Sequence, residues 1–127
     1  MEPFVNYPRQ KMLATQSSTA GIPNQGITRL TASSTYTLDA PVKGCLKTIY
    51  RASAQSTINT VVLAGSGRSF DGTGGTQALN LQPSTVAGNN ADISVTLLGE
   101  SSTQWRVISA WPAYTTSATA QGVRVST

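Results

Sequence analysis

Short segments of alternating apolar and polar residues recur from residue 35 to the end of the chain, and turn-forming residues separate them. This period of two predicts β-strands at 35–39, 45–52, 57–64, 77–82, 92–98, 103–110 and 121–126. No helical pattern of about ten residues lies between these segments. The sequence therefore predicts an all-β fold, an antiparallel β-sandwich or barrel of about six to eight short strands.

Alternation within each predicted strand indicates which side chains face the core. Ile93, Val95 and Leu97 point one way in their strand, and Trp105 and Val107 do so in the next. The same reasoning, applied to all strands, predicts a core of Tyr36, Leu38, Leu46, Tyr50, Ile58, Val62, Phe70, Leu79, Leu81, Ile93, Val95, Leu97, Trp105 and Val107.

Residues 1–30 have a different composition from the rest of the chain. They carry three of the six prolines, and their apolar residues follow neither the strand nor the helix period. Such a segment cannot build its own core, yet it is too apolar for a solvated linker. We therefore expect an extended N-terminal arm over 1–30 and one β-domain over 31–127.

The absence of histidine excludes several kinds of enzyme. Ser-His-Asp and Cys-His nucleophiles and histidine-ligated zinc all require that side chain. The carboxylates lie beside turns or strand ends, where solvated capping roles are usual. The glycine-rich stretch 63–75 lacks the Gly-Lys-Ser/Thr of a phosphate-binding loop, and its Asp71-Gly72 is expected to supply the positive φ of a hairpin turn. We expect no catalytic residue, no metal site and no cofactor.

Charge and cysteine content narrow the expected partners. The net charge of +4 is modest and the basic residues are spread along the chain, so no nucleic-acid partner is expected. No apolar run is long enough to cross a membrane, and no signal peptide is apparent. Cys45 is the single cysteine, which is compatible with assembly in a reducing cytoplasm.

Three groups of residues are candidates for contact with a partner. Lys43, Lys47 and Arg51 share one strand face by parity, and this face is either solvated or docked on an acidic protein surface. Trp111 and Tyr114 follow the end of the alternation and are candidates for an exposed contact or a sugar-binding platform. The candidate contacts in the arm are Phe4, Val5, Tyr7, Arg9, Lys11, Met12 and Leu13.

Two sequence segments are similar to a known family. The segment STYTLDAPVKGCLKTI (34–49) combines Thr-x-Leu, a proline-containing turn, a glycine and a Lys-Thr-Ile strand. The segment LLGESSTQWRVIS (97–109) runs from a strand through a Gly-and-Ser turn into a Trp-x-Val strand. Together they resemble the opening and closing hairpins of small all-β virion proteins of tailed bacteriophages, over about residues 33–110. The residues matched, in fold-defining roles, are Thr37, Leu38, Gly44, Lys47, Thr48, Ile49, Leu98, Gly99, Trp105 and Val107.

That family includes capsid decoration (cement) proteins and related head-fibre and tail-fibre domains, which are commonly trimeric. The resemblance implies a non-enzymatic protein, assembled in the host cytoplasm, that binds and stabilises the outer capsid surface of the virion. Its expected partners are the major capsid protein and, as a homotrimer, itself. The alternative is a tail-fibre or adhesin module that binds a host surface glycan. A hydrolytic enzyme is disfavoured by the missing histidine and the unpaired carboxylates.

Overall fold

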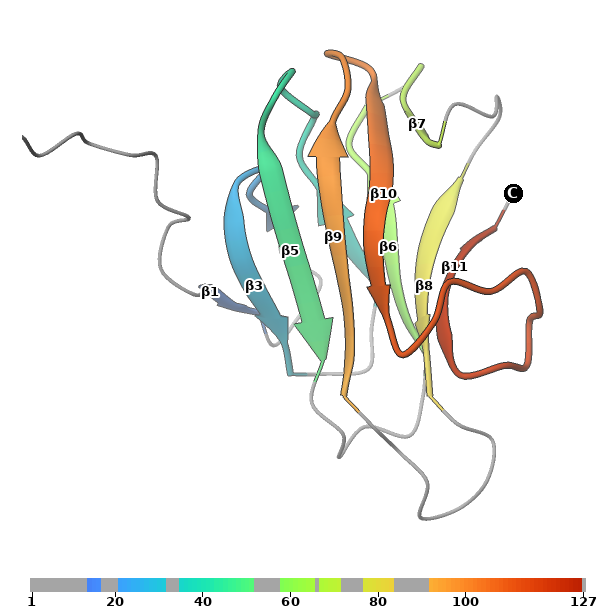
Figure 1. Cartoon of the computed structure of the whole chain (residues 1–127). Helices are drawn as coiled ribbons and strands as arrows, with labels where there is room; N and C mark the ends of the chain where they lie inside the picture. The colour runs from blue at the N-terminus through green and yellow to red at the C-terminus, as the bar shows by residue number, and fades with distance from the viewer. Residues whose placement is uncertain are drawn as a thin grey trace, which may run out of the picture.

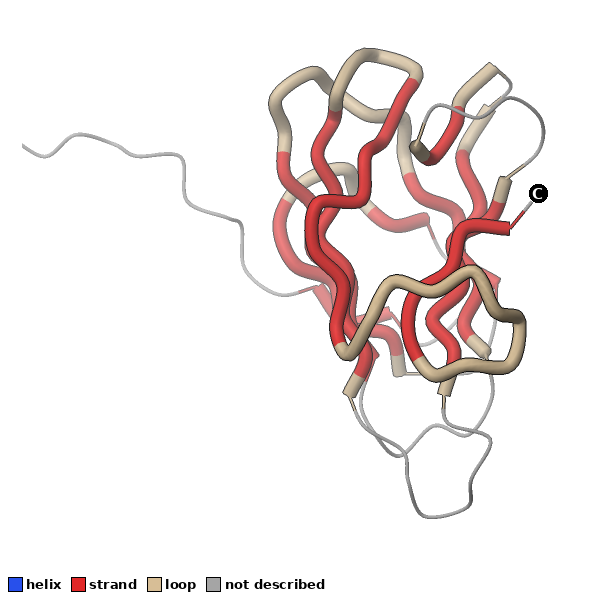
Figure 2. Tube along the Cα trace, turned by 45° about the vertical axis from the view of Figure 1, so that its right-hand side comes forward, coloured by secondary structure: helices blue, strands red, loops and turns tan. Residues whose placement is uncertain are grey.

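The computed structural model describes residues 14–16, 21–31, 35–51, 58–65, 67–71, 77–83 and 92–126. These residues form two facing β-sheets and contain no helix (Figures 1 and 2). The fold is therefore an all-β sandwich, as the alternating sequence pattern predicts.

Each sheet is defined by the order of its hydrogen-bonded strands. The six-stranded sheet runs β1 (Ala14–Gln16), β3 (Gly26–Leu30), β5 (Leu46–Arg51), β9 (Ile93–Gly99), β10 (Gln104–Trp111) and β7 (Ser69–Phe70). The five-stranded sheet runs β11 (Gly122–Ser126), β8 (Ala78–Gln82), β6 (Asn59–Leu63), β4 (Thr35–Leu38) and β2 (Gly21–Ile22). All seven predicted strands are present, and β1, β2, β3 and β7 are additional.

The strand pairing is mixed rather than purely antiparallel. From β1 to β9 each successive strand lies in the other sheet, so β1, β3 and β5 pair in parallel, as do β2, β4 and β6. The later part supplies the antiparallel pairs β5–β9, β9–β10, β6–β8 and β8–β11. The short β7 pairs in parallel with β10. The prediction of antiparallel pairing therefore holds for the later strands. The earlier strands alternate between the two sheets and pair in parallel within each sheet.

The expected boundary between arm and domain at residue 31 is wrong for residues 21–30. These residues form β2 and β3, and Ile22 and Leu30 are fully buried in the core. Their sequence hides this role because β2 has only two residues, too few to display a period. The part of the expected arm before β1, residues 1–13, lies outside the described residues and is called the N-terminal segment below.

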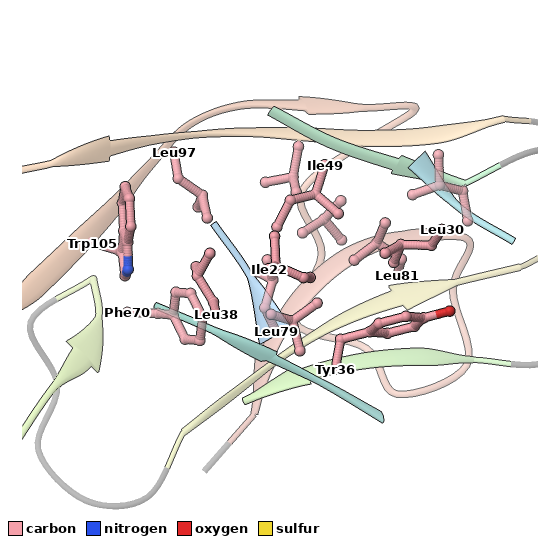
Figure 3. Close-up of a cluster of buried hydrophobic side chains, with 14 residues drawn as sticks. Ile22, Leu30, Tyr36, Leu38, Ile49, Phe70, Leu79, Leu81, Leu97 and Trp105 are labelled. Carbon is pink, nitrogen blue, oxygen red and sulfur yellow. The ribbon is translucent and has the colours of Figure 1, made fainter. Parts of the chain in front are cut away.

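The core fills the space between the two sheets (Figure 3). Of the predicted core residues, those that are fully buried are Tyr36, Leu38, Phe70, Leu79, Leu81, Ile93, Val95, Leu97 and Trp105. Val107 is partly buried against them. The core also contains five residues that the sequence pattern did not predict, namely Ile22, Leu30, Ile49, Val61 and Val123.

The predicted inward faces of β5 and β6 are wrong. Leu46 and Ile58 are exposed, and Tyr50 and Val62 are only half-buried. Directly opposed residues of an antiparallel pair point to the same side of the sheet. The buried apolar residues of β9 lie opposite Lys47, Ile49 and Arg51, and the buried leucines of β8 lie opposite Asn59 and Val61. The partner strands therefore set the inward faces of β5 and β6, and these faces carry polar residues.

The turn before β5 is closed against the end of β9. Gly44 donates its backbone N–H to the Gly99 carbonyl at 2.7 Å, and Gly99 donates to the Cys45 carbonyl at 2.8 Å. A Cβ atom at Gly99 would lie 2.0 Å from the carbonyl oxygen of Val42. Glycine at 99 is therefore required by close backbone approach.

Candidate functional site

The candidate contact residues of the N-terminal segment have no described structure. Phe4, Val5, Tyr7, Arg9, Lys11, Met12 and Leu13 all lie outside the described residues. The remaining candidates, which lie in or beside strands of the six-stranded sheet or after β10, can be placed.

The structure separates the three basic residues that were expected on one outer face. Lys43 is exposed in the turn before β5, whereas Lys47 and Arg51 are each 0% exposed. Lys47 lies opposite Leu97 and Arg51 opposite Ile93, both of which point into the core. The expectation that Lys47 and Arg51 contact solvent or an acidic partner is therefore wrong, because their register turns them inward.

The Lys47 ammonium finds partners on the neighbouring strand β3 and just before it. Its Nζ donates to Thr28 Oγ1 at 2.6 Å and to the Gln25 carbonyl at 3.1 Å. Burial lowers the pKa of Lys47 to about 8, and the nearby charge of Asp39 only partly opposes this effect. Lys47 is therefore a buried structural amine with neutral hydrogen-bond acceptors.

Trp111 and Tyr114 are exposed, which makes them available as surface contacts. Trp111 ends β10 with 63% of its surface exposed, and Tyr114 is 47% exposed. Ile108, also on β10, is 50% exposed. We call these three residues the apolar patch. The peptide bond between Trp111 and Pro112 is cis, and after it the chain leaves β10 for the five-stranded sheet.

A β-bulge in β10 changes which side chains face the core after Ile108. The pairing of β10 with β9 shifts between Val107 and Ser109, so Ile108 is an extra residue with no opposite partner. Val107 and Ala110 pack against the core, whereas Ile108 and Ser109 between them are exposed. Alternation from Trp105 and Val107 places Ile108 outside, as observed, but it would turn Ser109 inward and Ala110 outward, because it cannot anticipate the bulge.

A pocket of about 220 Å³ lies beside this bulge. It is lined by Asp71, Val107, Ile108, Ser109, Ala110 and Tyr114. Tyr114 reaches it from a segment that pairs with β11: Val123 donates its N–H to the Ala113 carbonyl at 2.9 Å, and Thr115 donates to the Val123 carbonyl at 2.9 Å. The pocket is therefore formed by the edge of β10 and by a chain segment bound to the other sheet.

Asp71 connects both sides of the pocket. Its backbone N–H donates to the Trp105 carbonyl at 2.7 Å, and its Oδ1 accepts the Val107 N–H at 2.8 Å. Its Oδ2 accepts the Tyr114 hydroxyl at 3.3 Å. Asp71 has a φ of 55°, as expected for an Asp-Gly turn, and this left-handed geometry is tolerated by aspartate better than by most residues. The Asp71 carboxylate thus continues the hydrogen bonding between β7 and β10 by one side-chain bond.

The electrostatics of the pocket favour a cation or a hydrogen-bond donor. Burial and the charge and hydrogen bond of Asp71 raise the pKa of Tyr114, so the phenol stays neutral. The side chains lining the pocket carry one carboxylate, two hydroxyls and otherwise apolar atoms. Among the described residues, no group of three or more His, Cys, Asp or Glu side chains is placed to hold a metal ion. Such a pocket can bind an ammonium, a guanidinium or a sugar hydroxyl, with an aromatic ring alongside.

The role of Asp71 was not predicted from the sequence beyond its turn geometry. Its contacts with Val107 and Tyr114 span 36 and 43 residues of the chain, so no local motif reveals them. The only sequence signal is that Tyr114 and Trp111 follow a strand without continuing its alternation.

Within the described ranges, the structure has no helix with the length and apolarity needed to span a membrane. Scans of the sequence against protein-family models and against curated proteins both return no match.

Proposed function

We propose that this chain is a non-enzymatic virion structural protein that binds the outer surface of a tailed-phage capsid and stabilises it. It acts as a homotrimer, with the major capsid protein as its partner, and it joins the virion during assembly in the host cytoplasm. The N-terminal segment contacts neighbouring subunits. The proposal is supported by the resemblance of segments 34–49 and 97–109 to such proteins and by the observed all-β sandwich.

The observation that carries the proposal is the apolar patch of Ile108, Trp111 and Tyr114. Exposed aromatic and aliphatic residues are typical of protein interfaces, and Ile108 and Tyr114 line the same pocket. Their backbone is fixed on both sides, because β10 pairs with β9 and residues 113–115 bond to Val123. A patch that is already ordered loses little conformational entropy on docking, which favours a permanent contact such as one on a capsid.

Deletion of residues 2–13 tests the role of the N-terminal segment. The deletion leaves β2 and β3 intact, unlike removal of residues 2–30, which would take Ile22 and Leu30 from the core. We expect the shortened protein to fold and its affinity for capsids to fall at least about tenfold, since the apolar contacts of the segment are lost. Cosedimentation with undecorated capsids measures the affinity. Occupancy equal to that of the full chain would remove the segment from the proposal.

Replacing Trp111 with alanine tests the apolar patch. Because Trp111 is 63% exposed, we expect the free energy of unfolding to change by less than about 0.5 kcal/mol. Binding to capsids should weaken about tenfold or more, as for an aromatic residue at the centre of an interface. Urea denaturation and cosedimentation give the two values. Val42→Ala, an exposed apolar residue in the turn before β5, is the control and should alter neither. Unchanged capsid binding by the Trp111 variant would contradict the proposed contact.

A second candidate function is glycan binding, and the pocket beside Asp71 is what favours it. A carboxylate hydrogen-bonded to the exposed Tyr114 combines an acceptor for sugar hydroxyls with a ring for the apolar sugar face. Under this alternative the chain is a tail-fibre or adhesin module. A glycan array probed with the full chain and with Asp71→Asn tests it: binding lost in the variant supports a sugar site, and a blank array for the full chain rejects it.

A further inference from the structure

The described residues cover only part of the β10 edge that faces away from β9. β7 pairs with β10 at Gln104 and Trp105. The backbone N–H of Val107, which points to the same edge, donates to the Asp71 carboxylate. From Ile108 to Trp111 the described residues provide no strand on this side of β10. An uncovered strand edge offers backbone donors and acceptors to an added strand.

Within the described ranges, the pocket at this edge carries a negative charge and its lining supplies no positive one. Asp71 forms no ion pair among the described residues, and the nearby Arg106 is bound to Glu100 at 3.0 Å. The protein as a whole has a net charge of +4, so a second copy is rich in the complementary charge. A lysine or arginine beside the apolar wall and the tyrosine ring would satisfy this pocket.

The N-terminal segment has the composition that this edge requires. Residues 9–13 read RQKML, contain no proline, and lead directly into β1. In an extended strand, Lys11 and Leu13 lie on one side and Met12 on the other. The segment therefore combines a cation with apolar neighbours and contains no proline that would remove a backbone donor.

We infer that residues 9–13 of a neighbouring copy add as a strand to the open edge of β10, with Lys11 against the Asp71 carboxylate. This inference deepens the proposed function, since it gives the contact between copies on the capsid. It assigns the Asp71 pocket to a second copy of this chain rather than to a sugar.

The distance that Lys11 can span explains why the cation comes from another copy. β1 and β7 are the two edge strands of the six-stranded sheet, five strand positions apart, which corresponds to about 24 Å (Figure 1). Lys11 is three residues before β1, so its backbone extends about 10 Å from that strand and its side chain about 6 Å more. The lysine cannot reach Asp71 of its own chain. A copy placed edge to edge brings its β1 and residues 9–13 directly beside β10.

This contact uses two different edges of the same sheet. It is therefore heterologous, and such contacts close into rings when the rotation between copies allows it. A ring of three copies is the closed form that agrees with the proposed trimer.

Charge reversal tests the pairing. The full-length chain and its variants are compared by sedimentation equilibrium without capsids. We expect Lys11→Glu and Asp71→Lys each to weaken self-association about tenfold or more, and the double variant to regain most of the loss. Lys43→Glu changes the net charge by the same amount at an exposed turn and should leave association unchanged.

A variant that spares the hydrogen bonds of Asp71 keeps the test independent of folding. Ser109→Arg places a cation on the exposed wall of the pocket and should also weaken association. The inference would be overturned if the wild-type chain remains monomeric. It would also be overturned if the charge-reversal variants show a folded protein in thermal melts and yet associate as the wild type does. Capsid cosedimentation is measured separately, so a failure of strand addition between copies and a failure of capsid binding give different results.

Discussion

Replacing Trp105 with alanine is expected to lower the free energy of unfolding by about 3 to 5 kcal/mol. Trp105 is fully buried, and it lies at one end of the core with Phe70 and Leu97 near it (Figure 3). The alanine variant leaves a cavity at a place where β10 also pairs with β7. A loss of this size is a large share of the stability of a small domain. Urea denaturation followed by circular dichroism measures it.

Trp105→Phe is the matched variant for this experiment. Trp105 Nε1 is buried and makes no hydrogen bond within the described part of the chain, so losing the indole N–H removes no such bond there. The phenylalanine variant should therefore lose clearly less stability than the alanine variant, because most of the ring volume is kept. Equal losses for both variants would show that cavity formation is not the cause.

The seven strands that the sequence predicted could be found because each displays alternation of its own. In β9, Ile93, Val95 and Leu97 are buried and the residues between them are half-buried, as the alternation predicts. The four additional strands could not be predicted in this way. β1, β2 and β7 have two or three residues, and β3 reads GITRL, beginning at a glycine three residues after Pro23. These strands form because longer neighbours supply their partners.

The direction of strand pairing was also outside the reach of local patterns. A parallel pair requires a connection that crosses to the other end of the sheet, and here the crossing strands lie in the opposite sheet. The path β3–β4–β5 shows this, since β4 connects two parallel neighbours while it belongs to the five-stranded sheet. Sequence alternation gives the same signal for both pairing directions.

Only part of the candidate site could be predicted, because local patterns do not show which distant residues meet. Trp111 and Tyr114 could be selected because they follow a strand that ends, and both are exposed. Asp71 meets Tyr114 only through folding, and the bulge at Ile108 breaks the pattern on which faces were assigned. Lys47 and Arg51 were assigned to the outer face because charge usually indicates exposure, whereas register with β9 decides their side.

Raising the pH from about 7 to about 9.5 is expected to stabilise the protein by about 2 kcal/mol through Lys47. In the folded state burial lowers the pKa of Lys47 to about 8, from the ordinary lysine value of 10.5 that applies in the unfolded chain. Between these two values the unfolded chain binds more protons at this lysine than the folded chain does. Stability then rises with pH, at about 1.4 kcal/mol for each unit. Urea denaturation at several pH values measures the slope.

The upper limit of this window comes from Tyr114. Burial and Asp71 raise the pKa of its phenol in the folded state. Above pH 10 the unfolded tyrosine ionises first, so the unfolded chain then binds fewer protons at this residue and stability falls. The measurement below about pH 9.5 therefore isolates the lysine, with Asp39 as the charge that acts on it.

Lys47→Met removes the buried charge while keeping a long apolar side chain. We expect this variant to be more stable than the wild type near pH 7 by about 1 to 2 kcal/mol, because relief of desolvation outweighs the lost bond to Thr28. Its stability should also be flat between about pH 7 and 9.5. Lys43→Met, which removes an exposed lysine three residues before β5, should keep the wild-type slope. If the Lys47 variant retains that slope, the alkaline stabilisation comes from another group and the folded lysine is not held near a pKa of 8.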